Sequence, residues 1–159
     1  GIGVFDQTML IKKLMPSKGV LTERQPTIGE LEDMEFGYKM AKEIGQLDIG
    51  QTVVVKHKAV MAVEAIEGTD ECIKRGGALG RGDAVVVKVA KPNQDLRFDV
   101  PTVGVKTINS MIVANSKALA IEADNTLLVE KSKVLELAKK NNINGNSCYF
   151  IEKYYIVCL

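Results

Sequence analysis

The residue types best suited to chemistry lie together in residues 88–104. This segment combines two acids, an amide and three cations with two prolines that stiffen it: Lys88, Lys91, Gln94, Asp95, Arg97 and Asp99, with Pro92 and Pro101. Carboxylates can hold a divalent cation, and that cation together with Lys or Arg can neutralise the charge of phosphoryl oxygens. The composition therefore suits cleavage of a phosphate anhydride. A solvated loop with incidental ion pairs is the alternative at this point.

A second cluster, residues 64–70, precedes a predicted helix. Gly68 allows a tight turn, and the first N–H groups of the helix can then meet an anion. Glu67 and Asp70 could add metal ligands, whereas Thr69 and Asp70 are also ordinary helix caps. A third cluster, residues 48–51, indicates by itself only a turn.

Composition limits the kinds of function that need to be considered. The 159 residues are 46% hydrophobic and carry a net charge of +1, which fits one globular domain and argues against a nucleic-acid partner. With a single histidine, His57, and three cysteines without metal-ligand spacing, any bound metal would need carboxylate ligands, as Mg²⁺ or Mn²⁺ does. The cysteines are expected to be free thiols. No apolar run approaches the roughly 20 residues of a membrane span, and no signal peptide is evident, so we expect a cytoplasmic protein.

The elements that must position these residues follow from periodicity and turn signals. We expect helices over residues 6–15, 27–45, 69–78, 105–115 and 132–141, and a loose glycine-rich link over residues 76–82. Hairpins are predicted at 52–56 with 59–65 and at 118–122 with 126–130, and a strand buried on both faces at 84–90. Residues 91–104 are expected to be irregular because of their prolines. The predicted fold class is α/β, with α+β as the alternative. It is a single domain whose mixed sheet is built from hairpin-helix units, with helices packed on it, and the tail could add edge strands.

These same clusters carry a resemblance to a known family. Residues 48–51, 62–70 and 91–104, with matches at Phe5-Asp6 and 19–22, resemble the LpxI-type UDP-2,3-diacylglucosamine pyrophosphatases. The resemblance runs in order from residue 4 to residue 143, and the long third motif is the most specific. It implies Mg²⁺-assisted hydrolysis of UDP-2,3-diacylglucosamine to UMP and 2,3-diacylglucosamine 1-phosphate in lipid A synthesis.

The resemblance suggests a role for one residue, and the chemistry of the matching motifs suggests roles for the others. The essential aspartate of the family, in its Arg-x-Asp-x-Pro-Thr segment, corresponds to Asp99, which we expect to be a metal ligand or a water activator. Lys91 and Arg97 are candidate catalytic cations. The remaining candidates divide into substrate-binding residues, namely Gln94, Thr69, Gly68, Lys88 and Thr102, and metal ligands that join Asp99, namely Asp70 and Glu67.

The family comparison predicts a division of the chain into three parts. Residues 1–26 would be a linker and entry helix from an amino-terminal domain that this sequence does not include, 27–143 the catalytic domain, and 144–159 a divergent tail. That amino-terminal domain, the inner-membrane surface contacted peripherally, and a second copy in a homodimer are expected partners. Two alternatives to catalysis stand beside this prediction. The domain would either bind a sugar nucleotide or acylated sugar without cleaving it, or serve only in assembly.

Overall fold

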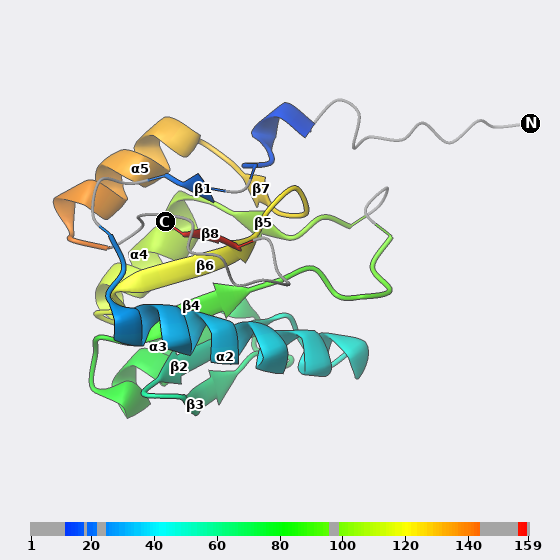
Figure 1. Ribbon diagram of the computed structural model, residues 1–159, viewed down its shortest axis with the longest axis horizontal. Helices are drawn as coiled ribbons and strands as arrows, with labels where there is room; N and C mark the ends of the chain where they lie inside the picture. Colours follow the sequence, from blue (N-terminus) through cyan, green and yellow to red (C-terminus); the bar gives the residue numbers. More distant parts are fainter. Residues whose placement is uncertain (1–11, 18, 22–24, 96–98, 144–155, 159) are drawn as a thin grey trace, which may run out of the picture.

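The computed structural model describes residues 12–17, 19–21, 25–95, 99–143 and 156–158, and has three layers (Figure 1). A six-stranded mixed sheet is covered on one face by helix α2 (Ile28–Gln46). The other face is covered by helices α3 (Thr69–Gly80), α4 (Val105–Val113) and α5 (Lys131–Lys140). This arrangement confirms the predicted α/β class and the single domain with helices packed on a mixed sheet.

The sheet order places strands distant in sequence side by side. The order is β1-β8-β6-β4-β2-β3, and β5 and β7 form a separate parallel pair. The strands are β1 (Gly19–Val20), β2 (Thr52–Lys56), β3 (Ala59–Val63), β4 (Val85–Lys88), β5 (Thr102–Val103), β6 (Ala118–Glu122), β7 (Leu127–Leu128) and β8 (Ile156–Cys158). Because β2 runs antiparallel to both β3 and β4, and β4 parallel to β6, the strands β3, β4 and β6 all end at the same edge of the sheet. We call this the carboxyl edge.

The first predicted hairpin is confirmed, and its tip is fixed by a buried acid. His57 and Lys58 both have positive φ, 53° and 57°, as the twist of a two-residue hairpin turn requires. Their N–H groups donate to the Asp33 carboxylate at 2.8 and 2.5 Å. Asp33 belongs to α2, which begins with the predicted capping box between Thr27 and Glu30.

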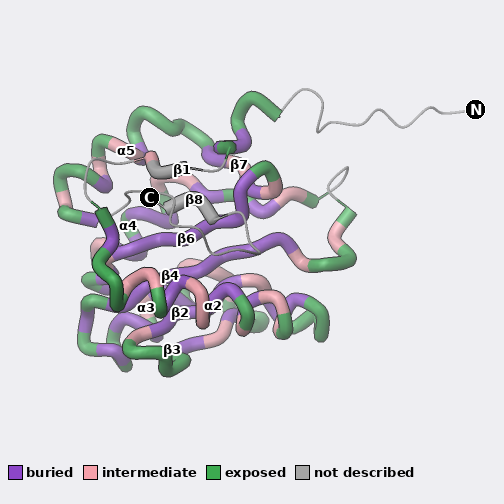
Figure 2. The backbone as a smooth tube through the Cα atoms, in the orientation of Figure 1, coloured by how far each residue is buried: buried purple, intermediate pink, exposed green. Residues whose placement is uncertain are grey.

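The strand predicted to be buried on both faces is the centre of the fold. All of β4 is buried, and Figure 2 shows it in the middle of the buried part of the chain. Val86 packs toward the helices α3 to α5, while Val85 and Val87 pack toward α2. Alternate side chains therefore serve different cores, which explains the run of consecutive valines.

The second predicted hairpin is wrong. β6 does not pair with β7; it lies between β4 and β8, and all five of its residues are buried. β7 instead pairs with β5, which lies in the segment expected to be irregular. The chain can form β5 there because both prolines precede this strand, and the Pro101 carbonyl accepts a hydrogen bond from the N–H of Leu127. The hairpin-helix unit is consequently not repeated.

The glycines of α3 are close-packing positions rather than a loose link, and the helix continues to Gly80. A Cβ added to Gly76 would lie 2.5 Å from the Val54 Cβ, and one added to Gly77 would lie 2.5 Å from the Ala114 Cβ. Only glycine allows α3 to approach both β2 and the end of α4 so closely. The predicted loose link is therefore wrong at these two positions.

Other predictions meet the structure only in part. Of the helix predicted over 6–15, the described part is a 3-10 turn, Lys12–Leu14. In the tail the described part is the strand β8, which pairs with both β1 and β6, so the prediction of an edge strand is wrong there. Cys72 is a free, buried thiol, as expected, whereas Cys148 lies outside the described residues.

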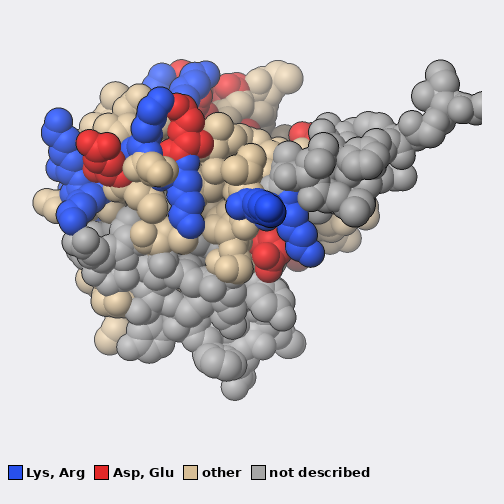
Figure 3. Space-filling model, turned by 90° about the horizontal axis from the view of Figure 1, so that it is seen from above, with Lys and Arg blue, Asp and Glu red and all other residues tan. Residues whose placement is uncertain are grey.

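Over the face seen in Figure 3, basic and acidic side chains of the described residues lie beside one another. None of the described helices is long and apolar enough to cross a membrane.

Candidate active site

The predicted clusters converge at the carboxyl edge of the sheet. Lys88 ends β4, and its register partner Thr52 begins the antiparallel β2. Directly after β3, the N–H of Glu64 donates to the Thr52 carbonyl at 2.9 Å. The N-terminus of α3 with Thr69 packs against the same edge, because the two hydroxyl oxygens of Thr52 and Thr69 are 3.4 Å apart.

A buried polar network connects three of these residues. Lys88 and Glu64 are only 6% and 8% exposed. The Lys88 ammonium donates to the Thr69 hydroxyl at 2.9 Å, and that hydroxyl donates to the Glu64 carboxylate at 2.9 Å. The second carboxylate oxygen of Glu64 accepts from the N–H of Gln51 at 3.4 Å. This network fixes a buried cation beside the start of a helix, where an anion is favoured.

The electrostatics of Lys88 join this network to the loop that follows β4. Burial, the largest effect, lowers the pKa of Lys88, and the negative charges of Glu64, Asp70 and Asp99 oppose that effect. The ammonium therefore lies in the field of three carboxylates: the predicted metal ligands Asp70 and Asp99, and Glu64, which directly follows β3. A buried cation whose pKa is lowered by burial, at the ends of the strands, is typical of a functional site.

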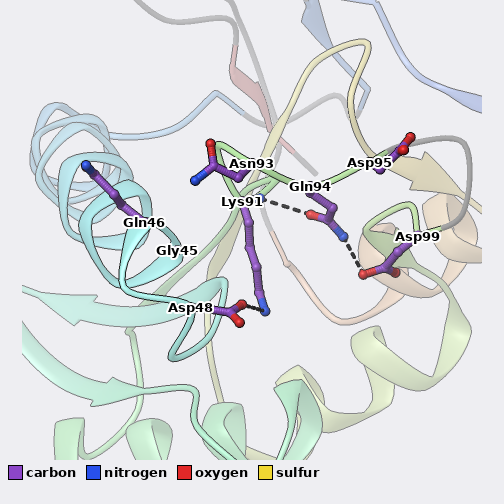
Figure 4. Close-up of a pocket in the computed structure, with 8 residues that line it drawn as sticks. All are labelled: Gly45, Gln46, Asp48, Lys91, Asn93, Gln94, Asp95 and Asp99. Atoms are coloured by element: carbon purple, nitrogen blue, oxygen red, sulfur yellow. Dashed lines mark hydrogen bonds and ion pairs between the residues drawn. The ribbon is translucent and has the colours of Figure 1, made fainter.

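The loop after β4 forms one wall of a pocket of about 380 Å³ (Figure 4). Its lining residues are Gly45, Gln46, Asp48, Lys91, Asn93, Gln94, Asp95 and Asp99. In Figure 4 the Gln94 side chain lies between Lys91 and Asp99. The Gln94 amide oxygen accepts from the N–H of Lys91 at 3.0 Å, and its amide nitrogen donates to Asp99 at 2.7 Å. Three residues predicted from one motif are thus brought together.

The third cluster contributes Asp48 to the opposite wall of this pocket. Asp48 follows α2 with a φ of 58°, a conformation that Asp tolerates better than most residues. Its carboxylate pairs with the Lys91 ammonium at 2.6 Å, and the hydrogen bond and charge of Lys91 lower the pKa of Asp48. The turn is tight at Gly50, where an added Cβ would overlap the carbonyl of Glu64. The turn indicated by the sequence therefore brings the pocket next to the Lys88 network.

The predicted metal ligands are only partly brought together. Asp70 accepts from Ser110 at 3.1 Å and from Lys106 at 2.9 Å, and the Lys106 side chain is largely exposed. Glu67 instead pairs with Arg75, whose hydrogen bond is the main cause of the lowered pKa of Glu67. Within the described part of the chain, no group of three or more His, Cys, Asp or Glu side chains could hold a metal ion.

The remaining predicted residues have simpler surroundings. Gly68 caps α3 with a φ of 80° and no side chain, and there is open space where its Cβ would be. Thr102 lies in β5, is exposed, and donates to the Val100 carbonyl at 3.0 Å. Arg97 lies outside the described residues.

Two residues at the carboxyl edge were not singled out from the sequence. Glu122, at the end of β6, forms an ion pair with Lys42 of α2 at 2.7 Å. An acid at the end of an otherwise apolar buried strand is a signal that could have identified Glu122. No comparable signal distinguishes Lys42 from the other charged residues of α2.

Comparison with known proteins connects the site to a family. A family profile described as the LpxI C-terminal domain matches residues 17–144. A protein of Caulobacter vibrioides named UDP-2,3-diacylglucosamine pyrophosphatase LpxI is 37% identical over 129 residues. The match covers 76% of this chain and 46% of that protein, so the chain spans about half the length of its relative.

Proposed function

This chain belongs to the LpxI C-terminal domain family, and on that premise we propose that it forms the site for hydrolysis of UDP-2,3-diacylglucosamine. The products would be UMP and 2,3-diacylglucosamine 1-phosphate. The observation that carries the proposal is the buried Lys88 ammonium, held by Thr69 within the field of Asp70 and Asp99 at the carboxyl edge. Two acidic motifs far apart in sequence thus lie near one buried cation, which supports a site that would bind a divalent ion and a diphosphate together.

The side chains of the site would have separate roles in cleavage of the anhydride. Lys88 and the first N–H groups of α3 would bind phosphoryl oxygens, since both carry positive charge into a partly buried site. Lys91 would release Asp48, which is highly exposed, and bind the same diphosphate. One water molecule is consumed: it loses a proton to the solvent as its oxygen bonds to phosphorus, the bridging P–O bond breaks, and the electron pair leaves with the departing phosphate. Gln94 would orient Asp99 beside these oxygens.

The donor set fits Mg²⁺. A magnesium ion that serves phosphate chemistry typically uses one or two protein carboxylates and completes its shell with substrate oxygens and water. We assign Asp99 and Asp70 to this role. Asp70 is available because its ion pair with Lys106, largely exposed, is weak. When bound, the ion would neutralise charge on the phosphoryl oxygens and polarise the phosphorus.

We further propose that apolar side chains beside the pocket face the acyl chains of the substrate, at the inner-membrane surface. Leu47, Ile49 and Ile66 are 71%, 48% and 104% exposed, and their two loops adjoin because Gly50 lies against Glu64. Exposed apolar groups gathered beside a polar pocket are suited to a ligand with both characters. Replacing Ile66 by Ser should weaken hydrolysis of a diacylated substrate while leaving the affinity for UDP unchanged.

The proposal is tested by UMP release, measured with and without Mg²⁺. The assay compares this chain alone with this chain joined to the remaining part of the Caulobacter relative. Asp99→Asn should abolish the release without unfolding the protein, and Asp95→Asn, which alters an acid of the same pocket, should retain most of it. Binding of the substrate without Mg²⁺ dependence, and without UMP from either form, would establish a binding module instead.

A further inference from the structure

The ion pair of Lys42 and Glu122 lies on the face of the sheet opposite to the Lys88 network, but at the same edge. Glu122 ends β6 and is 9% exposed; Lys42 belongs to α2 and lies over the Tyr38 ring at 5.6 Å. Their charged groups meet at 2.7 Å. Replacing a buried ion pair by apolar residues of similar size is often neutral or stabilising, so packing alone does not explain this pair.

Both partners of the pair also hold the backbone where the chain leaves β4. Glu122 accepts from the N–H of Ala90 at 2.9 Å, and Lys42 donates to the Ala90 carbonyl at 2.9 Å. The other oxygen of Glu122 accepts from Asn125 at 3.1 Å, so the carboxylate itself is held in place. Ala90 is therefore fixed on both sides by charged side chains from α2 and β6.

The fixed residue is the one before Lys91. From there a continuous chain of hydrogen bonds leads into the pocket: the N–H of Lys91 to Gln94 at 3.0 Å, and Gln94 to Asp99 at 2.7 Å. A displacement of Ala90 would move all three groups together. We propose that Lys42 and Glu122 are positioning residues, which set the place of Lys91, Gln94 and Asp99 for the reaction. This inference rests on the proposed function.

The variants follow from the contacts. Lys42→Met keeps most of the side-chain stem and removes both hydrogen bonds, and Glu122→Gln removes the charge while keeping one acceptor. Lys42→Arg keeps the cation and should restore both the activity and the slow hydrogen exchange that Lys42→Met loses. The matched control is Lys39→Met, which breaks an exposed ion pair with Glu35 on the same helix. Each protein is first shown to be folded at the assay temperature by its near-ultraviolet circular dichroism.

Two measurements separate positioning from general stability. Hydrogen exchange of the amides of Ala90, Lys91 and Asp99 should be at least about tenfold faster in Lys42→Met and Glu122→Gln, with β2 amides unchanged. Since a misplacement of about 1 Å can reduce a rate about 100-fold, kcat/KM for UMP release should fall between 10- and 100-fold. Lys42→Arg should recover to within about threefold, and Lys39→Met should match the wild type in both measurements.

The outcomes are distinguishable. Folded variants whose kinetics and loop hydrogen exchange match those of the wild type would overturn the inference. Hydrogen exchange that accelerates equally in β2 and in the loop would also overturn it, because the pair would then contribute only to overall stability. If the wild-type protein releases no UMP in any form, the proposed function fails. In that case the hydrogen-exchange comparison still decides whether the ion pair fixes Ala90. Unchanged exchange of the Ala90 amide in the variants would show that the pair does not fix it.

Discussion

Gly77→Ala tests the packing that brings α3 to the carboxyl edge. The added Cβ would lie 2.5 Å from the Ala114 Cβ and would overlap the Ala114 carbonyl as well. Carbon atoms in contact normally stay about 3.5–4 Å apart, so α3 and α4 must separate by about 1 Å. The obstacle is largely backbone and cannot move aside by a change of rotamer.

The magnitude follows from two opposing terms. Alanine in place of glycine in a helix contributes about 1 kcal/mol in favour of the variant, whereas overpacking costs up to about 3 kcal/mol. We expect Gly77→Ala to lower the free energy of unfolding by about 2 kcal/mol. The matched control is Gly29→Ala in α2, where an added Cβ has nothing within 4 Å. That change should raise the free energy of unfolding by up to about 1 kcal/mol.

Urea denaturation of the two variants measures the difference directly, at about 3 kcal/mol. Catalysis supplies a second measurement, because Asp70 in the first turn of α3 is hydrogen-bonded to Ser110 of α4. A shift between these helices should lower kcat/KM in Gly77→Ala and leave it unchanged in Gly29→Ala. Equal stability of the two variants would refute the close approach of α3 and α4.

Four further predictions follow. Asp33→Ala should lower the free energy of unfolding by about 2 kcal/mol in urea denaturation, since both N–H groups of the β2–β3 turn lose a charged acceptor. Lys91→Met should raise the pKa of Asp48 toward its ordinary value, as measured by NMR titration of the carboxyl carbon, because the lowering comes mainly from Lys91. Burial lowers the pKa of Lys88 below its ordinary value of 10.5. In the pH range between the lowered pKa and 10.5, the unfolded chain binds a proton that the folded protein does not. The stability of the wild type should therefore rise relative to that of Lys88→Met as pH increases through this range, in urea denaturation at a series of pH values. Burial also raises the pKa of Cys72 to about 12, so peptide mapping should find Cys72 unmodified by iodoacetamide at pH 8 until urea is added.

Features set by neighbours in the sequence were predicted well. The capping box of Thr27 and Glu30 depends only on one turn of helix, and the β2–β3 hairpin depends on a short turn between two apolar runs. The burial of β4 was evident because valines at consecutive positions can be satisfied only when both faces of a strand are covered. In each case the sequence signal is local, although the helices that cover β4 are distant in sequence.

The errors arose where the partner is distant in sequence. The apolar run of β6 and the turn after it indicate a hairpin, but β4 and β8 occupy both edges of β6, and neither is adjacent in the chain. The glycines of α3 suggested looseness because the sequence does not show that Val54 and Ala114 lie against them. A long-range contact can reverse the interpretation of a residue without changing any local signal.

The site was predicted as a set of motifs rather than as a geometry. Lys91, Gln94 and Asp99 come together because one short loop contains them all, and the motif already implied this. The ion pair of Lys42 and Glu122 next to this loop was not predicted, because the two residues are 80 positions apart and meet only when α2 lies over the end of β6. The residues that meet in the pocket could therefore be predicted, and those that contact the backbone just before them could not.

Buried charge identifies the same place without reference to any motif. Among the described residues, four charged side chains are buried: Asp33, Glu64, Lys88 and Glu122. Asp33 has a structural explanation in the β2–β3 turn, and the other three lie at the carboxyl edge, on both faces of the sheet. Burying a charge is unfavourable unless it is well paired, so an apolar edge would give a more stable domain. This fold concentrates such residues at the ends of three strands at a cost in stability, which is the pattern expected of a functional site.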